Sequence, residues 1–300
     1  MKIEEGVALA RFTTFGSGGP ARGFIRARSE EDVARALAWA AERDLPVLPL
    51  GFGSNLLVAD VGVEALALRL EGELAAVAIE GEKMVAGGGA ADALCARLAQ
   101  ASGLTGLEFA ASIPGTVGGG VCMNAGAWGS DFGAVLSRAL LVEHGGSRWL
   151  DSDQLGLRYR GSKLEPGQIV VRAEFRLERS SAEEIESGVQ AKKEQRKSSQ
   201  PSGIRTFGSV FKNPEHELGA GRMIDACGLK GERIAGARFS LKHANFIENC
   251  GGATTADALA LIDLARRRAY ERFGVVLEPE VRLIGEISLP PVEADSPRHG

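Results

Sequence analysis

The sequence predicts an α+β protein of two domains. Its 300 residues and 31.5 kDa correspond to roughly two domains at about 150 residues each, enough for a large buried core. Candidate strands and helices are mixed in both halves, and no repeat period is present. The composition changes at a charged helix predicted over 181–197, which is the best candidate for a domain boundary.

Composition and charge argue against several classes of protein. With 35 Lys and Arg against 39 Asp and Glu, the chain lacks the basic surplus of a phosphate-backbone binder. No apolar run reaches the ~18 residues of a membrane span, and the first residues contain no secretory signal. The four cysteines lie far apart and form no ligand set with the four histidines. We therefore expect a cytoplasmic protein with no nucleic-acid partner, no membrane insertion and no metal.

The N-terminal part predicts a β-α-β unit followed by a glycine loop. Residues 24–27 read as a strand, and Ser29 is an N-cap for a helix whose first turn is acidic, which suits the positive end of the helix dipole. A short apolar run at 46–50 leads into the sequence Gly-Phe-Gly-Ser-Asn at 51–55. Further strands are predicted at 56–58 and 65–70.

A second block repeats the mixture of strands and helices. Strands are predicted at 77–79 and 84–87, a helix from Asp92 to about Ser102, and a turn-rich glycine segment over 113–129. Residues 139–143 and 147–150 form a hairpin around Gly145-Gly146, and 168–177 alternates as a strand does.

The C-terminal part contains two helices and three strand candidates. The helices are expected near 221–227 and over 255–273, where apolar residues recur at helical spacing. The strand candidates are 209–212, 245–248 and the longer run 275–284. If the first of these is extended, Ser209, Phe211 and Asn213 share one face.

The glycines carry the first functional signal. The 51–55 loop allows backbone N–H groups to converge on an anion, although an ordinary tight turn explains a lone loop equally well. It lacks the third glycine of a dinucleotide fingerprint, and the chain has no P-loop. The second segment, 112–127, has side chains so small that a flat ligand could lie against the main chain. Together the two loops suggest one extended nucleotide cofactor bridging two lobes.

Several segments, in order, carry a family resemblance. They are Thr13-Thr14-Phe15 to Pro20-Ala21, Gly51 to Asn55, Ile113 to Gly119, Asn124-Ala125-Gly126, Tyr159-Arg160, Gly208 to Pro214, Ala220-Gly221, Gly228 to Gly231, Lys242 to Phe246 and Glu278 to Val281. This series resembles the UDP-N-acetylenolpyruvoylglucosamine reductases, also called UDP-N-acetylmuramate dehydrogenases, over nearly the whole chain except the last dozen residues.

The resemblance implies a fold and a reaction. The fold is a two-lobed FAD-binding domain of the vanillyl-alcohol-oxidase type at 1–178, with lobes at about 1–70 and 71–178, plus an α+β substrate-binding domain at 179–300. A strand near 276–287 belongs either to the substrate-binding domain or, returning in the fold, to the FAD domain. The implied reaction uses NADPH and non-covalent FAD to reduce UDP-N-acetylglucosamine enolpyruvate to UDP-N-acetylmuramate in peptidoglycan precursor synthesis.

The resemblance also assigns residues to roles. Three are implied as catalytic: Arg160, Ser209 and Glu280. The implied cofactor-binding residues are Gly51, Phe52, Gly53, Ser54, Asn55, Ser112, Ile113, Pro114, Gly115, Thr116, Gly118, Gly119, Asn124, Ala125 and Gly126. The implied substrate contacts are Tyr159, Lys197, Asn213, Arg222, His243 and Asn245.

The chemistry of the three catalytic candidates agrees with such a reaction, with alternatives open. Arg160 can hold a carboxylate through a two-point fork, or it can form a surface ion pair. Ser209 can donate a proton to a carbanion, or it can be a turn residue beside glycine. Glu280 must be protonated or orient a donor, since a carboxylate opposes a developing enolate; otherwise it pairs with a base such as Arg282.

The tyrosines suggest the short form of the family. Longer members close a tyrosine over the UDP diphosphate, but Tyr159 and Tyr270 are the only tyrosines here, and both belong to other motifs. The cation for the diphosphate then comes from Lys197, Arg222 or Lys230. Two other functions remain open, an FAD-linked oxidase on the same cofactor fold and a non-catalytic nucleotide-sugar binding protein.

Overall fold

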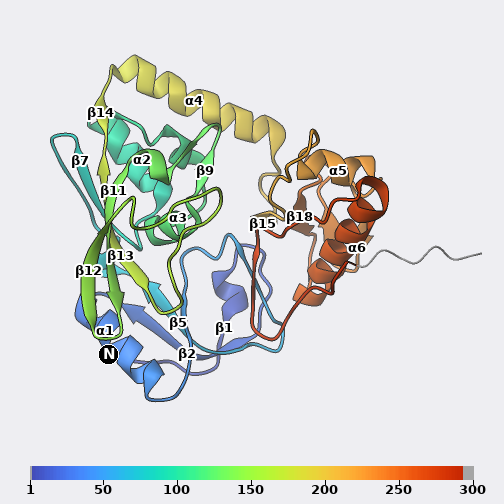
Figure 1. Cartoon of the computed structure of the whole chain (residues 1–300), viewed down its shortest axis with the longest axis horizontal. Coiled ribbons are helices and arrows are strands. Elements are labelled where there is room, and N and C mark those ends of the chain that lie inside the picture. The colour runs from blue at the N-terminus through green and yellow to red at the C-terminus, as the bar shows by residue number, and fades with distance from the viewer. Residues whose placement is uncertain (1, 293–300) are drawn as a thin grey trace, which may run out of the picture. The chain divides into compact units, whose positions relative to one another are not determined.

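The computed structural model describes residues 2–292, which divide into two compact units (Figure 1). Unit 1 contains the described residues up to Val7, Ala21–Phe52 and Glu64–Ser198; unit 2 contains Ala8–Pro20, Gly53–Val63 and the described residues from Ser199. This division differs from the predicted boundary at 178. The last eight residues, within the C-terminal dozen outside the family resemblance, lie beyond the described part. No helix among residues 2–292 is long and apolar enough to cross a membrane.

The first sheet of unit 1 carries the predicted β-α-β unit. Its strands lie in the order β1-β2-β5-β3, with bounds Val7–Ala8, Pro20–Ala27, Val63–Leu70 and Val47–Pro49. Strand β3 runs parallel to β5. Helix α1 (Glu30–Ala41) begins as predicted, because the Ser29 side chain accepts a hydrogen bond from the Asp32 N–H.

The second sheet of unit 1 is antiparallel and separates two hydrophobic cores. Its order is β12-β11-β13-β7-β6, with bounds Gly146–Asp151, Leu136–Glu143, Ile169–Arg176, Lys83–Gly87 and Val77–Glu80. Along β13, Ile169 and Val171 face the α1 core, whereas Val170 and Ala173 face a core that includes residues of α2 (Asp92–Ala101) and α3 (Val117–Met123). The predicted hairpin, strands and α2 are confirmed.

Short elements complete unit 1. The pairs are β8 (Leu104–Thr105) with β14 (Glu178–Arg179) and β9 (Gly126–Ala127) with β10 (Ser130–Asp131). The 3₁₀ segments are η2 (Gly72–Ala75), η3 (Glu108–Ser112) and η4 (Phe132–Ala134). Helix α4 (Ala182–Ser199), the long helix at the top of Figure 1, is the charged helix that the sequence predicts; it buries only Ile185 and Val189.

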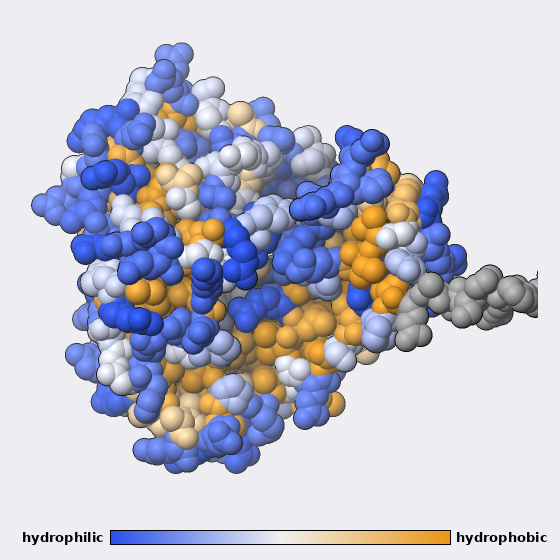
Figure 2. Space-filling model, viewed as in Figure 1, coloured by the Kyte–Doolittle hydropathy of each residue, from blue (hydrophilic) through white to orange (hydrophobic). Residues whose placement is uncertain are grey.

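Unit 2 is built on a four-stranded sheet and two helices. The order is β15-β18-β17-β16, with bounds Arg205–Ser209, Phe246–Asn249, Ala237–Phe239 and Arg233–Ile234. Helices α5 (Ala220–Ala226) and α6 (Thr255–Phe273) share its core, and hydrophobic residues show over both in Figure 2. Strand β4 (Leu56–Val58) pairs in parallel with β19 (Arg282–Ile284), and η1 (Leu9–Phe12) precedes them.

Three predictions about elements were wrong. The strand expected at 209–212 is β15, which ends at Ser209, and Val210 and Phe211 are both buried, so the alternation that put Ser209, Phe211 and Asn213 on one face fails. The run 275–284 is a strand only at 282–284. The segment predicted as turn-rich and glycine-rich, with no helix named in it, contains α3, whose Val117 and Val121 are buried.

Candidate active site

Within unit 1, Gly51 of the first glycine segment lies against Thr116 of the second. A Cβ on Gly51 would lie 2.5 Å from Oγ1 of Thr116, so only glycine permits this approach. Gly119 is exposed, and a Cβ there would meet nothing nearer than the same Oγ1 at 3.7 Å. At 116–119 the surface is therefore formed largely by main-chain atoms, because Gly118 and Gly119 have no side chains. This arrangement fits a flat cofactor held against the backbone.

Backbone hydrogen bonds fix this segment to the connection between β7 and α2. Val117 N–H donates to the Ala90 carbonyl at 2.9 Å, and Gly118 N–H donates to the Gly88 carbonyl at 2.8 Å. A Cβ on Gly118 would lie 3.0 Å from that Gly88 oxygen. Gly88 and Ala90 thus hold the loop through their carbonyl groups, a role that sequence reasoning missed although the glycine run at 87–89 was a usable signal.

Asp92, at the start of α2, lies directly behind the loop. Its N–H donates to the Gly115 carbonyl at 3.1 Å, and a Cβ on Gly115 would lie 2.4 Å from its Oδ2. Asp92 is fully buried, and neither carboxyl oxygen has a hydrogen-bond partner among the described residues. Burial raises the pKa of Asp92 to about 8, and burial together with Asp92 raises the pKa of Cys95 to about 12. The burial of Asp92 could not be predicted from the sequence, because an acidic residue in the first turn of a helix is common at exposed positions.

Arg196 joins α4 to the cofactor loop, and sequence reasoning missed it. Its guanidinium donates to the carbonyl of Ser112, and burial lowers its pKa. The Ser112 hydroxyl is buried without a partner among residues 2–292. Lys197, the predicted substrate contact next in sequence, is exposed on α4.

Arg160 lies at the tip of a two-residue hairpin in unit 1. Arg158 and Gly161 pair on either side of the tip, and Arg160 has a φ of 55°. Its guanidinium carbon lies 5.1 Å from the centre of the Tyr159 ring, which is 55% exposed. The side-chain amide of Asn124, a predicted cofactor residue, forms hydrogen bonds within the protein, with Asp131, Gly133 and the hairpin.

Ser209 and Glu280 are brought together in unit 2. Ser209 ends β15, and the N–H of Glu280 donates to the carbonyl of the next residue, Val210, at 2.8 Å. The side-chain amide of Asn55, from the first glycine loop, donates to the Glu280 carbonyl at 3.1 Å. A predicted cofactor residue and two predicted catalytic residues therefore share one small region. Their long separation in sequence hid this contact.

Two predicted substrate contacts hold the backbone. The Asn245 amide accepts from the Phe211 N–H at 2.9 Å and donates to the Phe211 carbonyl at 2.8 Å, and Asn245 is buried. Oδ1 of Asn213 accepts from the Ala220 N–H at 3.1 Å, at the start of α5. The Asn245 side chain thus fixes the segment after Ser209, and the substrate roles of these residues stay predictions.

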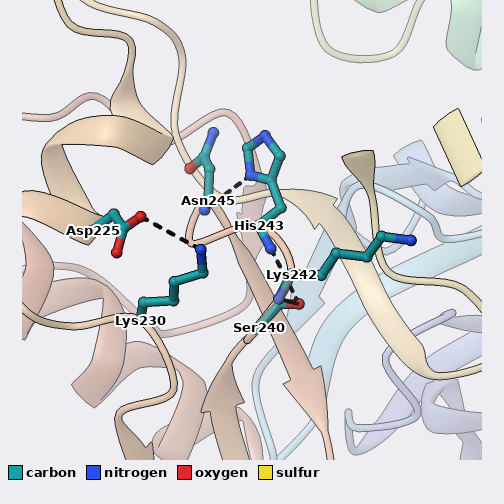
Figure 3. Close-up of polar contacts among 6 residues, drawn as sticks. All are labelled: Asp225, Lys230, Ser240, Lys242, His243 and Asn245. Carbon is teal, nitrogen blue, oxygen red and sulfur yellow. Dashed lines mark hydrogen bonds and ion pairs between the residues drawn. The ribbon is translucent and has the colours of Figure 1, made fainter. Parts of the chain in front are cut away.

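His243 belongs to a tightly bonded loop (Figure 3). The Ser240 hydroxyl accepts from the N–H groups of Lys242 and His243 at 3.1 and 3.4 Å, and His243 Nδ1 accepts from the Asn245 N–H at 3.2 Å. Burial, and then the nearby Lys230 cation, lowers the pKa of His243 against an opposing backbone hydrogen bond. A neutral imidazole that accepts at Nδ1 carries its proton on Nε2, so His243 can donate one hydrogen bond without a charge.

Cationic side chains belong to the same unit as this loop. Lys230 Nζ lies 3.4 Å from Oδ2 of Asp225, and in Figure 3 Lys242 points away from that pair. Arg222 is exposed on α5. These side chains provide positive charge within unit 2, whereas the predicted contacts Tyr159 and Lys197 belong to unit 1. No group of three metal-ligating side chains occurs among the residues that the structure describes.

Comparison with known proteins matches both halves of the chain. A family model described as FAD binding domain matches residues 21–147, and one described as UDP-N-acetylenolpyruvoylglucosamine reductase, C-terminal domain, matches 200–284. A protein of Rubrobacter xylanophilus named UDP-N-acetylenolpyruvoylglucosamine reductase is 42% identical over 280 residues, which span 93% of this chain and 94% of the relative. The chain belongs to the UDP-N-acetylenolpyruvoylglucosamine reductase family.

Other members of the family agree. A reductase of the same name from Anoxybacillus flavithermus is 37% identical and covers 94% of each chain. The crystal structure of the Thermus caldophilus reductase is 37% identical, covers 95% of this chain and 99% of its own, and has a TM-score of 0.84. Family membership confirms the predicted α+β fold with an FAD-binding domain, and a flavin-dependent oxidoreductase as the enzyme class.

Proposed function

We propose that this chain uses NADPH and FAD to reduce UDP-N-acetylglucosamine enolpyruvate to UDP-N-acetylmuramate. The product is a peptidoglycan precursor, so the reaction serves cell-wall growth, cell shape and division. It belongs in the cytoplasm, where NADPH and nucleotide-linked sugars are found. The observation that carries the proposal is 42% identity to a reductase of this name across 93% of the chain.

The residues present fit non-covalent FAD. Main chain at Gly51, Thr116, Gly118 and Gly119 would hold the cofactor, with Ser112 and the 113–115 loop beside them. When bound, FAD takes two electrons from NADPH and delivers them to the substrate. The chain contributes a cradle of main chain supported by Gly88 and Asp92.

Three side chains act on the enolpyruvyl group. Its double bond accepts hydride at the terminal carbon, negative charge spreads into the carboxylate, and the neighbouring carbon takes a proton. Arg160 holds the carboxylate by a two-point fork and stabilises that charge. Ser209 donates the proton. Glu280, whose N–H donates to the carbonyl of Val210, the residue after Ser209, orients a donor or is itself protonated.

Because this sequence has no lid tyrosine, cationic side chains must bind the substrate diphosphate. Lys230, Arg222 and Lys197 provide them, and the neutral His243 donates a hydrogen bond to the substrate. Tyr159 and Asn213 complete the proposed contacts. The side chain of Asn245 acts through the backbone that it fixes.

A product assay under nitrogen tests the proposal. Purified holoenzyme, NADPH and the enolpyruvyl sugar should yield UDP-N-acetylmuramate, one per NADPH consumed, detected by mass spectrometry. An FAD-linked oxidase would leave the sugar unchanged under nitrogen and would consume dioxygen in a parallel assay in air. A non-catalytic binding protein would bind the sugar without consuming NADPH. Either result contradicts the proposed function.

A further inference from the structure

The hairpin tip that carries Arg160 adopts a backbone conformation that needs support. Arg158 N–H donates to the Gly161 carbonyl at 2.9 Å, and Gly161 N–H donates back at 3.1 Å, so Tyr159 and Arg160 form a two-residue turn. The φ of 55° places Arg160 in the left-handed region, which a side chain with a Cβ disfavours. Such a conformation persists only where the surroundings fix it.

Both arms of the hairpin are bonded to the end of α3. On one arm, Nδ2 of Asn124 donates to the Arg158 carbonyl at 3.3 Å. On the other, the Ser162 hydroxyl donates to the Cys122 carbonyl at 2.9 Å. The two anchoring residues, Cys122 and Asn124, are two positions apart at the end of the glycine segment. The start of the same segment would hold the cofactor.

Asn124 is itself held firmly. Its Oδ1 accepts from the Gly133 N–H at 2.8 Å, its Nδ2 also lies 3.1 Å from Oδ2 of Asp131, and it is buried. The Ser162 hydroxyl is partly buried and also lies 3.4 Å from the Leu164 N–H, which donates to it. The anchor residues therefore have defined geometry before any ligand binds.

We infer that Ser162, together with Asn124, positions Arg160 by fixing the hairpin to the end of the glycine segment. This inference rests on the proposed function, in which Arg160 holds the substrate carboxylate. Ser162 touches neither substrate nor cofactor in this account; it acts through Arg160. Without the Ser162 hydrogen bond one arm of the turn is released, and Arg160 can leave the left-handed conformation that sets the direction of its side chain.

A double-mutant cycle measures this dependence. Ser162→Ala is made in the wild-type enzyme and in Arg160→Ala, with Ser162→Thr to restore the hydroxyl. Ser147→Ala, at an exposed position on β12, is the matched control. The measurements are flavin content, melting temperature, substrate dissociation constant, and the single-turnover rates of flavin reduction by NADPH and reoxidation by the enolpyruvyl sugar.

We expect Ser162→Ala to slow reoxidation by about 10- to 100-fold, because a small misplacement of a catalytic group costs that much. Flavin reduction should stay within about twofold, Ser162→Thr should recover most of the rate, and Ser147→Ala should change nothing. In the Arg160→Ala background the loss caused by Ser162→Ala should disappear. If Ser162→Ala does not fold, Ser162→Cys, which is nearly isosteric, enters the same cycle with a smaller expected loss.

Two outcomes overturn the inference while the proposed function stands. One is a wild-type reoxidation rate for Ser162→Ala beside a strongly impaired Arg160→Ala. The other is an equal fold loss from Ser162→Ala in both backgrounds, which would make Ser162 a merely structural residue. If Arg160→Ala itself reoxidises at the wild-type rate, the role of Arg160 in the proposed function fails as well.

Discussion

The carboxyl group of Asp92 lies beneath Gly115 in a fully buried position, with no hydrogen-bond partner in the described chain. Its pKa of about 8 is raised by burial from an ordinary 3.8. Between these two values the folded chain keeps a proton that the unfolded chain releases. The contribution of Asp92 to stability is therefore highest below pH 4, falls as the pH rises towards 8, and levels off above it.

Replacing Asp92 by Asn should remove this pH dependence. The amide has nearly the same shape and cannot ionise, so we expect Asp92→Asn to be more stable than wild type by about 2–4 kcal/mol at pH 7 and by almost nothing near pH 4. Urea unfolding across this pH range measures the difference. Glu186→Gln, on the exposed face of α4, is the control and should leave the curve unchanged. An Asp92→Asn chain less stable than wild type at pH 7 would refute the account of this residue.

The pKa of His243 tests the electrostatic effect of a single neighbouring cation, Lys230. Burial and Lys230 both lower its pKa below the ordinary 6.5, so removal of the cation should raise it. We expect Lys230→Met to shift the His243 titration, followed by NMR of the ring, upwards. Lys242→Met is the matched control, since Lys230 and not Lys242 is the cation that lowers the His243 pKa. An unchanged or lowered His243 pKa in Lys230→Met would contradict this electrostatic coupling.

Among the helices, α6 shows how a distant segment completes a helix end. Thr254 and Asp257 form a capping box, and Asp60 adds two further bonds: its Oδ1 accepts from the Thr255 N–H at 2.9 Å and its Oδ2 from the Ala256 N–H at 3.0 Å. Oγ1 of Thr255 donates to the Val58 carbonyl at 2.6 Å. These contacts fix the 53–63 segment to α6 within unit 2.

Loss of the Asp60 carboxylate should therefore weaken unit 2. We expect Asp60→Ala to lower the free energy of unfolding by about 1–2 kcal/mol, because two helix N–H groups lose a charged acceptor. Glu64→Ala, at a nearby exposed position, should change it by less than about 0.5 kcal/mol. Chemical denaturation of both variants provides the comparison. Equal stability of Asp60→Ala and wild type would show that solvent replaces these bonds.

Elements with local signals could be predicted from the sequence, and elements made by distant contacts could not. Helices α1 and α6 have apolar periodicity, and Ser29 caps α1 as predicted. Helix α3 contains Gly118-Gly119-Gly120, a poor helix sequence, and it forms because Gly118 and Val117 bond to the Gly88–Ala90 backbone. Strand β15 ends early because its register with β18 shifts after Thr206, next to Gly208 with a φ of 83°.

The division of the whole molecule has the same physical origin. The Thr13-Thr14-Phe15 segment belongs to unit 2, because Phe15 packs on Phe207, its carbonyl accepts from Asn249, and Thr14 Oγ1 donates to the Thr206 carbonyl. These partners lie about 190 or more residues away, beyond any local pattern. Motif resemblance nevertheless predicted the family, and it selected Ser209 and Glu280, which the fold brings together.

The most direct test of the proposed chemistry is the single-turnover reoxidation of the NADPH-reduced enzyme by the enolpyruvyl sugar under nitrogen, wild type against Ser209→Ala. If Ser209 donates the proton, its loss should slow this step by about 10²- to 10⁴-fold, while flavin reduction by NADPH, which needs no protein acid, stays nearly intact. Stopped-flow absorbance of the flavin follows both steps. Equal slowing of the two steps, or wild-type reoxidation by Ser209→Ala, would contradict the account.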